Sequence, residues 1–206
     1  MPDMNTRDAA MERIADYLLL KGAFVQDVGL FHGKMGIAMA LHLYAGKWDD
    51  EMLSEYAWDL LRQVYDGVHT DMPVGLESGL AGIGYAVTVL RKAGAVDGNL
   101  NDILGEIDAK IMEHDPRRLT DFSVRTGLGG LALYLELRQS VEPVRTFDRQ
   151  YMAELQAIMK NSGTLGGCQG LMELLDSPAF PVSEYVEHPL GIDGGCAWYI
   201  LKSVWP

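Results

Sequence analysis

The sequence predicts an all-α fold in which helices form a repeated, layered array. A glycine-rich turn that runs straight into an apolar segment recurs five times along the 206 residues. We number these repeat starts 1 to 5; they lie at residues 29–41, 75–83, 125–131, 163–171 and 191–198, with anchor glycines Gly33, Gly79, Gly127, Gly167 and Gly195. The anchors are 28 to 48 residues apart, a spacing typical of supersecondary units that stack into an array. No stretch shows the sustained alternation of a strand, so we expect no sheet.

The spacing of apolar residues predicts helices of two kinds. The segments that follow the repeat starts are apolar nearly all round, which is typical of helices packed on every side. They lie at 37–44, 83–90, 131–135, 171–175 and 197–203. The segments between them, and residues 6–20 before the first, carry apolar residues on one side only. These one-sided helices are expected at 49–64, 100–111 and 151–159.

Alternating one-sided and fully apolar helices predict an outer and an inner layer, arranged as an open solenoid or a closed ring. Glycine at the start of every inner helix favours a ring. A residue without a Cβ lets helix ends approach closely around an axis and permits left-handed backbone. No linker or change of composition divides the chain, so we expect a single domain over residues 1–206.

The composition excludes several classes of function. A net charge of −12 argues against nucleic acid or an anionic membrane as the main partner. An acidic surface suits a cationic partner, although it is more commonly a solvated face. The two cysteines, Cys168 and Cys196, are too few for a disulfide scaffold. No segment resembles a secretory signal or reaches the length of a membrane span, so we expect a soluble, cytoplasmic protein.

The ordered set of repeat starts is similar to the lanthionine synthetase C-like family, in particular to its Bacteroides-type group. The likeness covers the chain from about Asn5 to the end. It rests on four stretches, 31–37, 79–84, 115–118 leading to 126–128, and 189–196. The resemblance implies an α/α toroid, an inner ring of helices inside an outer ring. Members of the family usually have more repeats than five. The smaller number here makes an incomplete ring, with a gap, an alternative to a closed one.

The resemblance also implies work on peptides. Classical members cyclise dehydrated peptides by adding a cysteine thiol to a dehydroamino acid, activated by zinc held by two cysteines and a histidine. This sequence departs from that pattern, because Gln169 follows Cys168 where the family has histidine, and Cys196 lies after its glycine pair. None of the five histidines is adjacent to a cysteine, and catalytic zinc needs three protein ligands. We therefore expect no metal and no cofactor.

Three functions remain open at this point. The first is a peptide-binding accessory in the modification of a ribosomally made peptide, acting without zinc chemistry. The second is a zinc-dependent peptide cyclase that forms thioethers, with Cys168 as one ligand and the others supplied from distant repeats. The third is a non-catalytic scaffold for partner proteins. An edge at residues 178–206, with its apolar run 197–201 and Trp205, suggests self-association or a partner protein.

The residues just before the repeat glycines are expected to line one mouth of the ring. Four of them are candidates for substrate binding: His32, Glu77, Arg125 and Asp193. Arg125 and the helix N-termini would hold a carboxylate or phosphate, while the two acids would receive an amine or lysine of a peptide. An ion-pair network that closes the mouth is the structural alternative. Ser78 and Thr126 are expected to be helix N-caps.

Overall fold

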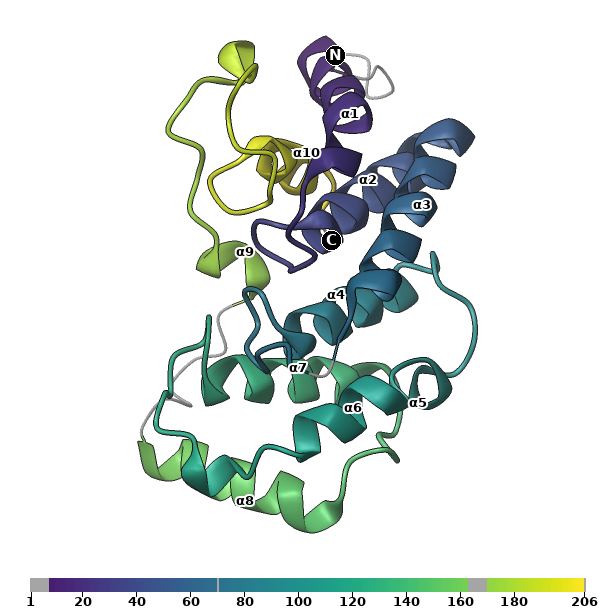
Figure 1. Cartoon of the computed structure of the whole chain (residues 1–206). Coiled ribbons are helices and arrows are strands. Elements are labelled where there is room, and N and C mark those ends of the chain that lie inside the picture. Colours follow the sequence, from purple (N-terminus) through teal and green to yellow (C-terminus); the bar gives the residue numbers. More distant parts are fainter. Residues whose placement is uncertain (1–7, 70, 163–169, 206) are drawn as a thin grey trace, which may run out of the picture. The chain divides into compact units, whose positions relative to one another are not determined.

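The computed structural model of the protein describes residues 8–69, 71–162 and 170–205 (Figure 1). These residues form helices and loops and contain no strand, which confirms the all-α class. The chain divides into two compact units. Unit 1 combines the N-terminal part up to Tyr65 with the C-terminal part from Leu175, and unit 2 is Asp66–Leu174. The single domain expected over residues 1–206 stays a prediction.

The helices of unit 1 come from both ends of the chain. They are α1 (Ala9–Lys21), η1 (Gly22–Phe24), α2 (Lys34–Trp48), α3 (Glu51–Gly67, whose last two residues belong to unit 2), η3 (Val182–Glu184) and α10 (Cys196–Val204). α2 is buried on all sides, whereas α1 and α3 each bury one face. α10 packs against α2 and α1, so the first and last helices of the chain meet in this unit (Figure 1).

Unit 2 repeats the arrangement with consecutive segments. Its helices are α4 (Leu80–Lys92), α5 (Leu100–Ile103), α6 (Gly105–Met112), η2 (Pro116–Arg118), α7 (Leu128–Val141), α8 (Arg149–Ser162) and α9 (Leu171–Leu174). The mostly buried helices α4 and α7 pack together, with α6 against α4 and α8 against α7. The expected helix at 100–111 is broken at Leu104 into two short helices. Ile103, which was expected on the apolar face of this helix, is exposed, whereas the side chain of Asp108 is buried.

Each described glycine turn folds back onto the start of its own helix. We number positions relative to the anchor glycine. In all four described repeats, the N–H at +1 donates to the carbonyl at −6. The four bonds are Lys34 to Asp27 (2.8 Å), Leu80 to Pro73 (2.9 Å), Leu128 to Asp121 (2.9 Å) and Cys196 to Pro189 (2.8 Å). The backbone of the turn thus supplies the acceptor that a helix N-terminus needs.

The anchor glycines are required by this close approach and not by left-handed backbone. Their φ angles lie between −119° and −102°, which is extended backbone open to other residues. A Cβ on Gly79, however, would lie 2.1 Å from the Pro73 carbonyl oxygen, and one on Gly127 would lie 2.2 Å from that of Asp121. The expected role of glycine in close packing therefore holds, and its expected left-handed conformation is not used at the anchors.

The residue at −6 shapes each turn in one of two ways. In repeats 1 and 3 it is an aspartate whose Oδ1 accepts the N–H at −4, at 2.6 Å for Asp27 and 2.8 Å for Asp121. In repeats 2 and 5 it is a proline, Pro73 or Pro189. Asx turns and a fixed proline φ both restrict the backbone before the helix begins.

Neighbouring repeats meet in the same register in both units. The N–H at −2 donates to the carbonyl at −2 of the other repeat, from Glu77 to Arg125 (2.8 Å) and from Asp193 to Phe31 (3.1 Å). The glycine at +3 then lies against the apolar residue at −3 of its neighbour. A Cβ on Gly130 would lie 2.8 Å from the Leu76 Cβ, and one on Gly36 would lie 3.0 Å from Ile192 Cγ1. Repeat 2 is thus joined to repeat 3 as repeat 5 is joined to repeat 1.

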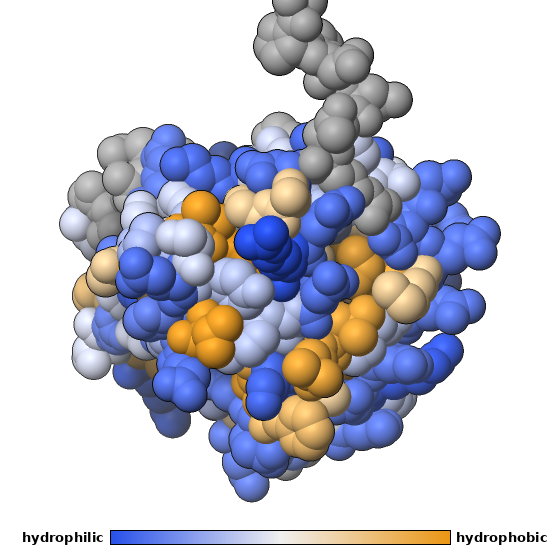
Figure 2. All heavy atoms as spheres, turned by 90° about the horizontal axis from the view of Figure 1, so that it is seen from above, coloured by the Kyte–Doolittle hydropathy of each residue, from blue (hydrophilic) through white to orange (hydrophobic). Residues whose placement is uncertain are grey.

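The apolar end of the chain is part of a core. Within the run 197–201, which suggested an interface, Ala197, Trp198, Ile200 and Leu201 are buried as α10 packs on α2 and α1. On the face shown in Figure 2, apolar residues occur in separate areas with polar residues between them. Among the described residues, no helix has the length and apolar character needed to cross a membrane.

Gly36→Ala is expected to lower the free energy of unfolding by about 1–3 kcal/mol, the usual cost of overpacking. Its Cβ would lie 2.0 Å from the Leu30 carbonyl oxygen. The matched control is Gly46→Ala in the same helix, where a Cβ meets nothing within 4 Å and alanine should stabilise by roughly 0.4–1 kcal/mol. Urea unfolding measures both variants, and a Gly36→Ala protein as stable as wild type would contradict the packing described here.

Candidate functional site

The four predicted site residues form two contacts between an acid and a basic side chain, one in each unit. Glu77 Oε2 lies 3.7 Å from Arg125 Nη1 in unit 2, and Asp193 Oδ2 lies 3.6 Å from His32 Nε2 in unit 1. Each pair joins two neighbouring repeats beside the backbone hydrogen bond at −2. Both acids, Glu77 and Asp193, are at position −2 of their repeats. Arg125 is also at −2 of its repeat, whereas His32 is at −1.

The pair in unit 1 is built on a fixed carboxylate. The Asp193 side chain is 5% exposed, and its Oδ1 accepts the Asp176 N–H at 2.6 Å. The Asp176 carbonyl in turn accepts the N–H of Gly194 at 2.8 Å, a glycine whose φ of +64° few other residues adopt. His32 is 48% exposed on the outer side of this carboxylate. The arrangement holds one imidazole at the surface over a buried acid.

The pair in unit 2 is more evenly exposed. The side chain of Arg125 is 33% exposed and that of Glu77 is 24% exposed. Arg125 Nη2 also donates to the carbonyl of Leu174 at 2.9 Å, at the end of α9. Partly exposed ion pairs contribute only about 0–1 kcal/mol to stability, so stability alone is a weak reason for these charges.

The first N–H groups of the inner helices are bonded to carbonyls of their own turns in the described repeats. The +1 N–H of each described repeat is bonded to the −6 carbonyl. The +2 N–H groups of Ala81 and Ala197 likewise donate to Val74 and Leu190. The expectation that these termini would hold a carboxylate or phosphate stays a prediction.

Ser78 and Thr126 are not the N-caps expected from their residue types. The N-cap residues are Gly79 and Gly127, without a side-chain cap bond. The Thr126 hydroxyl instead donates to Asp121 Oδ2 at 2.6 Å. Hydrogen bonds from Thr126 and from the Ser123 N–H lower the pKa of Asp121. These side chains stabilise the turn, while backbone carbonyls cap the helix.

The described residues do not fit the zinc centre of the resembling family. They contain no group of three His, Cys, Asp or Glu side chains able to hold a metal ion. Cys196 is buried, its thiol donates to the Tyr185 carbonyl (3.4 Å), and burial raises its pKa to about 11. Zinc binds the thiolate, which such an environment disfavours. Cys168, the other candidate ligand, lies outside the described residues.

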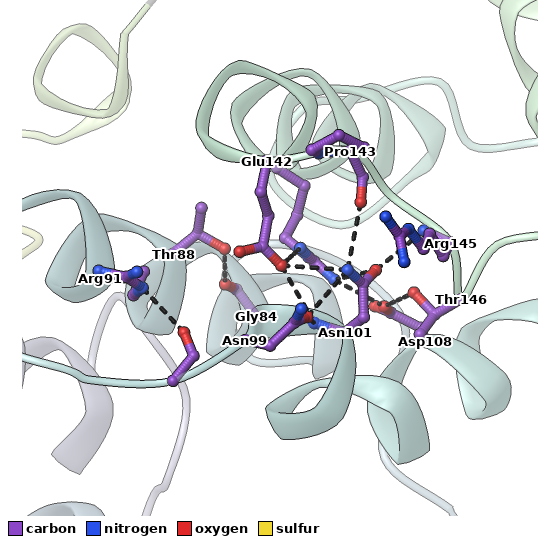
Figure 3. Close-up of polar contacts among 12 residues, drawn as sticks. Gly84, Thr88, Arg91, Asn99, Asn101, Asp108, Glu142, Pro143, Arg145 and Thr146 are labelled. Carbon is purple, nitrogen blue, oxygen red and sulfur yellow. Dashed lines mark hydrogen bonds and ion pairs between the residues drawn. The ribbon is translucent and has the colours of Figure 1, made fainter.

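A buried polar cluster in unit 2 was not predicted from the sequence (Figure 3). Asp108 and Arg138 are both fully buried, with Nη2 of the arginine 3.3 Å from Oδ2 of the aspartate. The hydroxyls of Tyr134 and Thr146 donate to the same carboxylate, each at 2.5 Å. Burial, followed by the neighbouring Asp108 charge, raises the pKa of Tyr134 well above its ordinary value.

The rest of the cluster ties the loop after α7 to α5. Glu142 Oε1 lies 3.6 Å from Arg138 Nη1 and accepts the Asn101 side-chain N–H at 3.1 Å. The Asn101 Oδ1 accepts the Arg145 N–H at 2.8 Å. An arginine within an apolar inner helix was the available signal for this cluster. Because its core is closed to solvent, we assign the cluster to structure and not to ligand binding.

Comparisons with protein-family models, with curated proteins and with solved structures find no match to this chain.

Asp108→Ala is expected to lower the free energy of unfolding by about 3–5 kcal/mol, because the buried Arg138 charge loses its partner. The double variant Asp108→Leu with Arg138→Met removes both charges and should recover most of that loss. The control is an exposed ion pair at the end of the same helix, between Lys110 and the C-cap residue Glu113. Glu113→Ala should lower the free energy of unfolding by less than about 1 kcal/mol. Urea unfolding compares the three variants. A double variant as unstable as Asp108→Ala would contradict the charge argument.

Cys196 is expected to resist alkylation in the folded protein. The test uses the Cys168→Ser variant, in which Cys196 is the only cysteine left. Iodoacetamide at pH 8 should modify Cys196 at least about a hundredfold more slowly in the folded protein than in the urea-unfolded protein. The thiolate is the reactive species, and the raised pKa makes it scarce in the folded protein. Since this thiol ionises more readily when unfolded, stability should also fall as the pH rises from about 9 to about 11. Rapid alkylation of the folded protein would show that the thiol is accessible.

Proposed function

We propose that this chain is a lanthionine synthetase C-like protein with an α/α toroid fold. In this proposal it binds a ribosomally made peptide as an accessory during the modification of that peptide, without zinc chemistry. The ring is supported by the register shared between repeats. The same −2 hydrogen bond that joins repeat 2 to repeat 3 also joins repeat 5 to repeat 1. A link from the last repeat to the first favours a closed ring over an open solenoid, in which terminal repeats are capped.

The observation that carries the peptide-binding proposal is the pair of equivalent ion pairs at the repeat starts. Each contact lies where two repeats meet, and its basic side chain is partly exposed, 33% for Arg125 and 48% for His32, whereas Asp193 is buried. In a toroid, such positions face one mouth of the ring. The partly exposed Glu77–Arg125 pair can exchange one partner for the charged group of a peptide at little cost, because such a pair contributes little to stability.

The alternatives are less well supported by the described residues. A zinc-dependent cyclase would require Cys168 together with ligands from elsewhere, and Cys196 is buried as a thiol. The proposed scaffold that binds partners through the C-terminal edge is less well supported, because Ala197, Trp198, Ile200 and Leu201 are buried as α10 packs on α1 and α2.

The proposal predicts that Arg125→Ala weakens binding of the cognate precursor peptide by on the order of 1–3 kcal/mol, the scale of a lost charged hydrogen bond. Melting should change little. Calorimetry on the labelled precursor and thermal unfolding are measured on the same variant. The matched control is Arg117→Ala, which removes an exposed arginine paired with Asp115 (2.9 Å) and should leave affinity unchanged. A large fall in melting temperature with intact affinity would assign Arg125 to structure.

The proposal also predicts far less than one zinc per chain in protein purified without chelators. Elemental analysis measures the metal content. A zinc content close to one per chain that is lost in Cys168→Ala would establish the cyclase alternative in its place.

A further inference from the structure

The helix α3 carries large apolar side chains on its exposed side. Among the described residues, three of the eight large apolar side chains that are exposed belong to this one helix: Met52 at 60%, Trp58 at 38% and Tyr65 at 76%. Single apolar residues scattered over a surface are normal, whereas several of them close together mark an interaction surface. The exposed side of α3 is therefore a candidate for an interface.

Two aromatic and two acidic residues share one side of this helix. Trp58 and Tyr65 are seven residues apart, which places them on the same side at a separation of about 10 Å along the axis. Glu51 and Glu55 precede Trp58 by seven and three residues, so they lie on that side as well. Both glutamates are exposed. We call these four residues the α3 face.

The α3 face carries negative charge that the helix itself does not neutralise. Within the described part of the chain, Glu51 and Glu55 form no ion pair. The single basic residue of α3 is Arg62, and its guanidinium is paired with Asp59. A surface with aromatic side chains and unpaired carboxylates is complementary to a partner that is both apolar and cationic.

The indole of Trp58 is held in a fixed position for such a contact. Its ring meets the imidazole of His42 on α2 edge-on, with centroids 5.0 Å apart and planes at 89°. His42 is 5% exposed, and burial lowers its pKa, so the imidazole is neutral near pH 7 and does not repel a cation. A tryptophan that is already ordered and partly exposed suits the role of an interface anchor, because little entropy is lost on binding.

We propose that the α3 face binds a cationic amphipathic helix of a partner protein. Apolar side chains seven residues apart on the partner contact Trp58 and Tyr65, which matches the two-turn repeat of a helix packed along α3. Lysine or arginine side chains beside them pair with Glu51 and Glu55. The inference goes beyond the proposed function, since none of these residues belongs to the repeat junctions.

The charge of the α3 face decides between this occupant and two others. A second copy of the chain in a symmetric contact would place the same patch on both sides of the interface. The glutamates would then face each other, and like charges oppose such a contact. An anionic membrane is disfavoured for the same reason, and the whole chain carries a net charge of −12. A cationic helix alone gains from both the aromatic and the acidic residues.

The test measures binding of three fluorescein-labelled peptides to the whole protein by fluorescence anisotropy. The first is a leucine–lysine peptide with leucine at i, i+3, i+4 and i+7, which forms one apolar side when helical. The second has the same composition in scrambled order, and the third has glutamate in place of lysine. Salt near 150 mM limits unspecific attraction, because the screening length is then about 8 Å. The first peptide should bind at least about tenfold more tightly than either of the others.

Variants of the α3 face locate the binding. Trp58→Ala and Tyr65→Ala should each weaken binding of the leucine–lysine peptide by about tenfold or more, as expected for aromatic anchors. Glu55→Lys should weaken it by a similar factor through charge reversal. Tyr65 is 76% exposed, so its variant tests the face even where Trp58→Ala loosens the packing on His42. Circular dichroism and thermal unfolding confirm that each variant is folded.

Two control variants lie in unit 2. Ile103→Ala removes an apolar side chain that is 42% exposed, and Glu113→Lys makes the same change of net charge as Glu55→Lys at an exposed glutamate. Both should leave the affinity within about twofold of wild type. A loss in Glu113→Lys equal to that in Glu55→Lys would overturn the proposal, because binding would then report the average charge of the protein.

Three further results would overturn the proposal. One is equal binding of the scrambled or the glutamate peptide, and another is unchanged affinity in Tyr65→Ala and Glu55→Lys. The third is sedimentation that shows a dimer of the wild-type protein that Tyr65→Ala converts to monomer, which would assign the α3 face to a second copy. Binding to phosphatidylserine vesicles that Tyr65→Ala abolishes would likewise assign it to a membrane.

Discussion

The start of each described inner helix depends on a backbone contact that only glycine permits. The carbonyl at −6 accepts the first helical N–H, and the anchor glycine lies so close to this turn that a Cβ would be 2.1 to 2.5 Å from backbone atoms. The bond satisfies a donor that would otherwise be left buried, which is costly. Because the turn is thereby fixed against its own helix, the residues beside the glycine have defined positions.

This constraint explains why the candidate site recurs. Position −2 bonds to position −2 of the neighbouring repeat in both units, and the glycine at +3 admits the apolar residue at −3. Any charged side chain at −2 or −1 is then brought to a junction between repeats. The ion pairs Glu77–Arg125 and His32–Asp193 follow from the same backbone geometry.

The buried cluster of unit 2 serves a different purpose. Asp108 and Arg138 lie in the core with Tyr134 and Thr146, where isolated charges would be expensive. Their mutual bonds connect α6, α7 and the loop before α8 (Figure 3). Such buried polar groups have their full effect only when satisfied together.

The sequence by itself determined the all-α class, the alternation of buried and one-sided helices, and the positions of the glycine turns. Apolar periodicity and glycine placement are local signals, so they can be read along the chain. Only the tertiary structure decided that Asp193 meets His32, that Glu77 meets Arg125, and that Asp108 is buried beside Arg138. These pairings join segments distant in sequence. They depend on how backbones approach one another in three dimensions, which leaves no periodic signal in the sequence.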